Sequence, residues 1–150
     1  MAFKPIATNP AVMRYISDGK PWPDEKIIEF VERQQRHYRE LEYCLWKLIL
    51  RGEGRLVGFC GLQPLDDLPG VEIGWWLQED QWGKGLATES ARVALKDGFE
   101  RIGLTQVVAV ALREHRASIH VMEKLGMRYE SDVKHHGFPV VLYSIEKLSG

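Results

Sequence analysis

A glycine-rich stretch at residues 79–91, EDQWGKGLATESA, contains the residue types best suited to hold an anionic ligand. Gly83 and Gly85 flank Lys84, and residues that favour a helix follow at once. Glycines in a turn that enters a helix let several backbone amides converge, and the positive end of the helix dipole adds to the attraction. The pattern therefore indicates either a seat for a phosphate-like group or an ordinary tight turn that holds no ligand.

The stretch fits neither of two familiar nucleotide-binding motifs. A P-loop has the pattern GxxxxGK[ST], but here Lys84 precedes the second glycine. A dinucleotide fingerprint has the pattern GxGxxG, and residues 86–88 supply no third glycine. The physical argument for an anion site remains, but these two classes of nucleotide-binding protein are excluded.

The wider stretch VEIGWWLQEDQWGKGLATES resembles the acetyl-CoA-binding motif of the GNAT superfamily of N-acyltransferases, [Q/R]xxGx[G/A]. Gly85 and Ala87 match its fourth and sixth positions, and Trp82 replaces the glutamine or arginine. Downstream, REHRASIHVMEKLGM resembles the "N..S..v.EKlGF" signature of the Rim-type (RimJ/RimL-like) ribosomal-protein acetyltransferases, with His115 replacing the asparagine. The closing GFPVVLYSIE resembles that branch's last strand. The resemblance covers roughly residues 10–147.

This resemblance implies that acetyl-CoA is a co-substrate and that its pyrophosphate lies on the backbone amides of residues 83–88. Lys84 would add positive charge and Thr88 a hydroxyl. Main-chain groups at Trp76 and Leu77 would bind the pantetheine arm, because the family's sheet splays there, and one amide could polarise the thioester carbonyl. The residues assigned to the cofactor are Trp76, Leu77, Trp82, Gly83, Lys84, Gly85, Leu86, Ala87, Thr88, His115 and Ser118.

The reaction that the resemblance implies is direct attack of a neutral amine on the thioester. Glu72 is our candidate for the general base, although an exposed or ion-paired strand carboxylate is an equal alternative. Ser118 is the first candidate to protonate the departing thiolate, by its place in the motif. Tyr143 is the second, and a core or pocket-wall tyrosine is the alternative for it. Many family members carry a tyrosine acid where this chain has Met122.

We expect no metal site. His120, His135 and His136 match no tight ligand spacing, and adjacent histidines on a strand point to opposite faces.

The elements that must position these residues follow from periodicity and turn signals. We expect one helix to begin after Asn9 and a second at Asp24. A hairpin at 43–50 and 55–62 follows, and then a strand at 71–77. The rest of the chain is expected to form a helix after the glycine loop, a buried strand at 105–112, a helix at 116–125 and two strands at about 128–134 and 139–147. The predicted fold is α/β and GNAT-like, with a mixed, mainly antiparallel, splayed central sheet and helices on both faces.

The family's opening strand has little room before the first helix, so we expect it to be short or missing. A missing strand would expose a sheet edge, which a homodimer could cover. The 150 residues indicate a single GNAT-like domain over 1–150, and the net charge of −1 argues against nucleic-acid binding. No apolar run suits a membrane span or secretory signal, and Cys44 and Cys60 suit reduced thiols, so we expect a cytoplasmic protein.

The predicted function is therefore acetyl transfer from acetyl-CoA to a primary amine, either a protein N-terminal α-amine or a small-molecule amine, in a ternary complex. The alternative is a non-catalytic acyl-CoA-binding sensor or interaction domain.

Overall fold

The computed structural model describes residues 2–148 and has one mixed sheet between two helical layers. The segment before the sheet forms α1 (Lys4–Ala7), α2 (Pro10–Met13) and α3 (Asp24–Leu41). The strands are β1 (Leu45–Ile49), β2 (Leu56–Pro64), β3 (Val71–Leu77), β4 (Gln106–Ala111), β5 (Arg128–His135) and β6 (Phe138–Glu146). Between β3 and β4 lie a 3₁₀ turn (Glu79–Gln81), α4 (Leu86–Asp97) and a π-helical turn (Gly98–Ile102), and α5 (Arg116–Lys124) connects β4 to β5.

From α2 onward the predicted order of the main helices and strands is confirmed, but α1 precedes them as a helix that the sequence did not predict. Within residues 2–148 no strand precedes α3. The six strands follow the order β1-β2-β3-β4-β6-β5, with β3 and β4 parallel and the other neighbours antiparallel. The family's opening strand is thus missing from the described chain, and α1 and α2 occupy its part of the sequence. Pro10 is the first residue of α2 and Pro5 is the second residue of α1, positions at which the amide has no partner within the helix.

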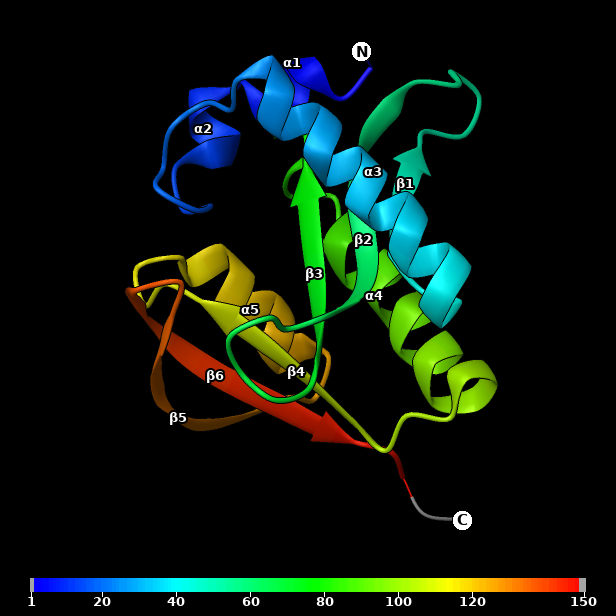
Figure 1. Ribbon diagram of the computed structural model, residues 1–150, viewed down its shortest axis with the longest axis vertical. Helices are drawn as coiled ribbons and strands as arrows, with labels where there is room; N and C mark the ends of the chain where they lie inside the picture. Colours follow the sequence, from blue (N-terminus) through cyan, green and yellow to red (C-terminus); the bar gives the residue numbers. More distant parts are fainter. Residues whose placement is uncertain (1, 149–150) are drawn as a thin grey trace.

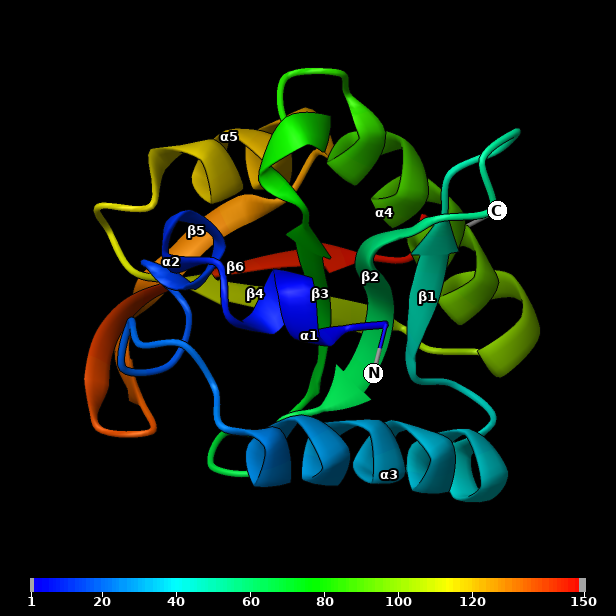
Figure 2. The same cartoon turned by 90° about the horizontal axis from the view of Figure 1, so that it is seen from above.

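Each face of the sheet has its own buried cluster. The first cluster lies under α4 and α5 and includes Ile73, Ala91, Val107 and Met122. The second includes Phe3 and joins the N-terminal helices and α3 to β1 and β2 through Phe30 and Phe59. Figure 2 shows α3 on one side of the sheet and α4 and α5 on the other. Alternation along β3 sends the Trp75 side chain to the first cluster and the Trp76 side chain to the second.

The sheet opens between β3 and β4. Strands β2 and β3 pair continuously from Gly58↔Leu77 to Pro64↔Val71, whereas in the described chain β3 pairs with β4 at Glu72↔Val108 alone. Figure 1 shows β3 upright, while β4 and β6 run obliquely away from it. The carboxyl-terminal half of β3 therefore has backbone groups that no neighbouring strand uses on the β4 side. This splay confirms the expected form of the sheet.

Candidate active site

The glycine loop and the start of α4 form a site with free backbone amides. Gly83 and Gly85 both have φ of 76°, the left-handed region that glycine adopts readily. Gly85 is the N-cap of α4 and supplies no side-chain cap, so the first amides of this 12-residue helix have no acceptor from a capping side chain. Lys84 is exposed beside them. The loop has the geometry of an anion site at a helix N-terminus.

Trp82 ties this loop to the end of β3. Its indole Nε1–H donates to the Leu77 carbonyl at 3.0 Å, and the side chain is 47% exposed. The loop is thereby held next to the open part of the sheet. Leu86 and Ala87 are half-buried at the start of α4, and Thr88 is buried, so the Thr88 hydroxyl is less available to a ligand than the sequence suggested.

Along β3, the backbone amide and carbonyl groups of successive residues face alternate edges of the strand, and this alternation decides which residues present these groups to the opening. The Gln78 amide donates to the Val57 carbonyl at 2.7 Å, and backbone groups of alternate residues face the partner strand in an antiparallel pair. The groups of Trp76 therefore face β2, where the Trp76 carbonyl approaches Gly58 so closely that an added Cβ would lie 1.9 Å from it. The groups of Leu77 and Trp75 face the side from which β4 has diverged.

Glu72 lies at the point where the sheet opens, and its side chain is on the face opposite α4 and α5. Burial raises the pKa of Glu72, while the Gln63 hydrogen bond and the nearby His135 and His136 rings oppose that rise. A raised pKa suits a carboxylate that must accept a proton near neutral pH. Glu72 makes no salt bridge within residues 2–148, so the ion-paired alternative finds no support there.

Sequence reasoning missed a relay of side-chain amides that holds Glu72. Gln63 Nε2–H donates to Glu72 Oε1 at 2.8 Å, and Gln34 Nε2–H donates to Gln63 Oε1 at 2.9 Å. Gln34 Oε1 in turn accepts the Leu45 amide at 2.9 Å. The relay fixes both amide orientations and joins α3 and three strands to the carboxylate. The one feature of the sequence that could have predicted this relay is the register of β2 and β3, in which Gln63 lies opposite Glu72.

Ser118, His115 and Tyr143 lie on the other side of the opening. Ser118 is buried in the first turn of α5, and His115 is the N-cap of that helix. The His115 ring stacks on Tyr15, with centroids 4.6 Å apart, and burial lowers its pKa. Tyr143 packs against the buried cluster under α4 and α5, and its ring centroid is 5.9 Å from that of Tyr129. No contact within the described chain gives Tyr143 a catalytic partner, so its role stays a prediction.

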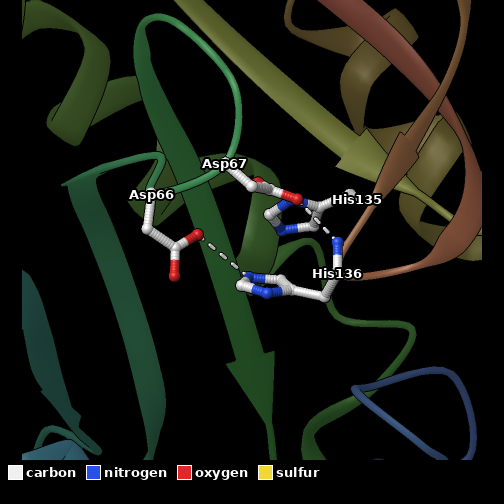
Figure 3. A group of neighbouring side chains, drawn as sticks. All are labelled: Asp66, Asp67, His135 and His136. Carbon is white, nitrogen blue, oxygen red and sulfur yellow. Dashed lines mark hydrogen bonds and ion pairs between the residues drawn. The ribbon is translucent and has the colours of Figure 1, made fainter.

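One argument against a metal site is wrong. His135 and His136 were expected to point to opposite faces of a strand, but β5 ends at His135 and His136 has a positive φ of 51° in the following turn. Their rings lie 4.1 Å apart and both approach the loop between β2 and β3, as Figure 3 shows. His120 lies apart, exposed on α5.

Residues 1–128 match the family model of the acetyltransferase (GNAT) domain. The chain belongs to this family. It is an N-acetyltransferase of the GNAT type, as the two sequence motifs predicted, and enzymes of this family use acetyl-CoA.

The relatives extend over most of the chain. An uncharacterised Bacillus subtilis protein, YkkB, is 30% identical over 140 residues, which cover 92% of this chain and 80% of that protein. The spermidine N(1)-acetyltransferase of Escherichia coli K12 is 26% identical over 135 residues, covering 89% of this chain and 69% of the enzyme. RimL, a ribosomal L7/L12 α-N-protein acetyltransferase solved with coenzyme A, shares the fold at a TM-score of 0.75 and 15% identity, covering 94% of this chain and 84% of RimL. This last likeness is one of fold.

None of the helices formed by residues 2–148 has the length and apolar content that a membrane crossing requires.

Proposed function

We propose that this enzyme transfers the acetyl group of acetyl-CoA directly to a primary amine within a ternary complex. The observation that carries the proposal is the alignment of three features along one opening of the sheet. These features are the uncapped start of α4, the unpaired end of β3, and the partly buried carboxylate of Glu72.

The cofactor would occupy this opening from the glycine loop inward. Its pyrophosphate would accept hydrogen bonds from backbone amides at residues 83–88, and Lys84 would add charge at the rim. The pantetheine arm would pair with the backbone of β3 in the manner of an added strand. Leu77 and Trp75 present groups on that side, so we move this role from Trp76 to Trp75 and retain Leu77. Trp82 would hold the loop and the strand in register through its bond to Leu77.

Glu72 would accept the proton of the amine, directly or through water. Deprotonating a lysine-like amine at neutral pH costs about 4–5 kcal/mol, whereas an α-amine costs about 1 kcal/mol. A base therefore helps both acceptors and matters more for the first. Ser118, buried at the start of α5, is the proposed donor to the departing thiolate, which is already a fair leaving group.

The cysteines support direct transfer rather than a covalent acetyl-cysteine intermediate. Cys44 and Cys60 are both buried, and burial raises the pKa of the Cys60 thiol to about 11. Burial also raises the pKa of Cys44. Thiols that are neutral and inaccessible are poor nucleophiles. The chain thus offers no cysteine suited to carry the acetyl group between two half-reactions.

The proposed acceptors are a protein N-terminal α-amine, as in RimL, or a small-molecule amine, as in the spermidine enzyme.

A homodimer also stays a proposal, although β1 carries Lys47 and a bulge at Leu48/Ile49, two features that discourage edge-to-edge pairing. Location in the cytoplasm stays a prediction from the sequence.

The test is release of free thiol from acetyl-CoA across a panel of amines, with spermidine, lysine-containing peptides and peptides with a free α-amine. We expect at least one class to accelerate release and Glu72→Gln to lower kcat by about 10²–10⁴-fold. Glu100→Gln, which changes an exposed glutamate beyond α4, is the matched control and should retain wild-type kcat. Binding of CoA without acceleration by any amine would favour the non-catalytic acyl-CoA-binding domain instead.

A further inference from the structure

Two surface loops bring four metal-ligand side chains together away from the glycine loop. Asp66 and Asp67 belong to the loop between β2 and β3, His135 is the last residue of β5, and His136 lies in the turn that follows it. Figure 3 shows the four side chains converging from these two loops. One donor atom from each residue lies within 4.8 Å of the other three. We propose that this cluster, Asp66–Asp67–His135–His136, binds a divalent transition-metal ion of the zinc type.

The donor set fits such an ion. Two imidazole nitrogens and two carboxylate oxygens give a four-coordinate site, which zinc prefers, and imidazole favours transition metals over magnesium or calcium. Zinc–ligand distances of about 2.0–2.2 Å in a tetrahedron place neighbouring donors about 3.3–3.5 Å apart. His136 Nε2 and Asp66 Oδ1 are already 3.1 Å apart, and His135 Nδ1 and Asp67 Oδ1 are 2.6 Å apart. Binding therefore needs these two close pairs to separate slightly, and donors that lie farther apart, within the 4.8 Å spread of the cluster, to move closer together.

The surroundings of Asp67 resemble the supporting contacts that orient a ligating carboxylate. The His136 amide donates to Asp67 Oδ2 at 2.6 Å, so one oxygen is held by the backbone while Oδ1 faces the His135 ring. The same turn thus supplies an imidazole ligand and the hydrogen bond that positions a carboxylate ligand. The positive φ of His136 makes this arrangement possible, because the turn aims its ring and its amide at the same loop.

Access from solvent is open on one side of the cluster. The side chains of Asp66 and His136 are 72% and 54% exposed, whereas those of Asp67 and His135 are 33% and 16% exposed. An ion could therefore arrive at Asp66 and His136 and complete its coordination with the more buried pair. The bound ion would join the loop after β2 to the turn after β5, which belong to opposite halves of the sheet.

The competing account is a pair of His–Asp contacts that bind no metal. Both accounts explain the short distances, but only the metal site requires all four side chains for one binding event.

The test uses the full chain without a histidine tag, stripped with a chelator and titrated with zinc chloride by calorimetry. We expect one ion per chain, and visible bands typical of tetrahedral cobalt when Co²⁺ replaces zinc. His136→Ala and Asp67→Asn should each weaken zinc binding at least tenfold. His120→Ala, which removes an exposed histidine on α5, should leave the affinity unchanged.

Circular dichroism of the metal-free variants checks that they remain folded, and Asp66→Asn provides a second isosteric variant. Absence of binding at a hundredfold molar excess of zinc would overturn the proposal. Binding that survives in His136→Ala, Asp66→Asn and Asp67→Asn would also overturn it, because the ion would then lie elsewhere.

Discussion

At the scale of the residue, the proposed reaction depends on how the Glu72 carboxylate is held in a partly buried place. Glu72 lies on a strand where an unpartnered charge would be costly. The amide relay from Gln34 through Gln63 supplies one hydrogen bond to it and orients it without neutralising it. A held carboxylate whose pKa is raised by burial is what the proposed role as a base requires.

Gln63→Leu tests the relay. Because the Gln63 hydrogen bond lowers the pKa of Glu72 against the effect of burial, its loss should raise that pKa further. A base works only when deprotonated, so the acid limb of the kcat profile should move to higher pH. The measurement is kcat against pH for the wild type and the variant. Gln35→Leu, which changes an exposed glutamine on α3, is the control, and an acid limb that stays in place in Gln63→Leu would contradict a positioning role.

His115→Asn tests the cost of keeping an imidazole neutral. Burial lowers the pKa of His115 in the folded chain. Just below about pH 6.5, therefore, the His115 ring is protonated in the unfolded state but still neutral in the folded state. The free energy of unfolding should therefore fall as the pH drops from about 6.5 toward the lowered pKa, and above that range this loss is absent. In His115→Asn the fall should be smaller by this contribution. Urea unfolding at a series of pH values measures it, and an equal slope in both proteins would refute the argument.

At the scale of the element, the start of α4 has two structural features that matter for the proposed site. It ends the glycine loop without a side-chain cap, and it leaves amides for a ligand. An added Cβ at Gly85 meets nothing within 4 Å, so a clash with the protein is not what makes glycine necessary there. The positive φ and the close approach of a ligand are the two remaining reasons.

Comparing Gly85→Val with Gly52→Val separates the effect of the positive φ from the effect of a ligand that approaches the backbone closely. Gly52, in the turn between β1 and β2, also has a positive φ, 91°, and open space around an added Cβ. Both variants should lose about 1–2 kcal/mol of stability from backbone strain. Only Gly85→Val should weaken CoA binding, by at least tenfold, as measured by calorimetry. Equal CoA affinity in the two variants would argue against the proposed cradle.

At the scale of the whole molecule, the N-terminal segment does not pair with the sheet as a strand. It packs against the sheet through buried side chains instead. Phe3 is 3% exposed, and its ring centroid lies 4.4 Å from that of Phe59 and 5.3 Å from that of Phe30. The segment therefore covers the α3 face of the sheet and completes a cluster that β1, β2 and α3 could not close by themselves. It also brings Tyr15 against His115 at the opening of the sheet.

Phe3→Ala should lower the free energy of unfolding by about 3–5 kcal/mol, because it removes a buried aromatic side chain and leaves a cavity. Chemical unfolding of the wild type and the variant measures the loss. Phe138→Ala, at a residue 39% exposed, is the control and should cost much less. A loss in Phe3→Ala as small as that expected for Phe138→Ala would mean that the N-terminal segment contributes little to the core.

The sequence by itself determined the order of elements, the glycine loop and the family. Helical and strand periods, capping residues and turn glycines act over a few neighbouring positions, so they can be read along the chain. The motif around Gly85 and the segment from His115 to Leu125 are local in the same sense. A simple count of residues before Pro10 also predicted that the first strand is short or missing, and the structure decided between the two.

Only the tertiary structure decided which side chains share a site. Gln34, Gln63 and Glu72 come from a helix and two strands, and their contact depends on strand register and on how α3 packs. The choice between Trp75 and Trp76 depends on which edge of β3 loses its neighbour. The cluster of Asp66, Asp67, His135 and His136 needs two loops far apart in sequence and a positive φ at His136. Such contacts are set by packing between distant segments, which no local pattern along the chain encodes.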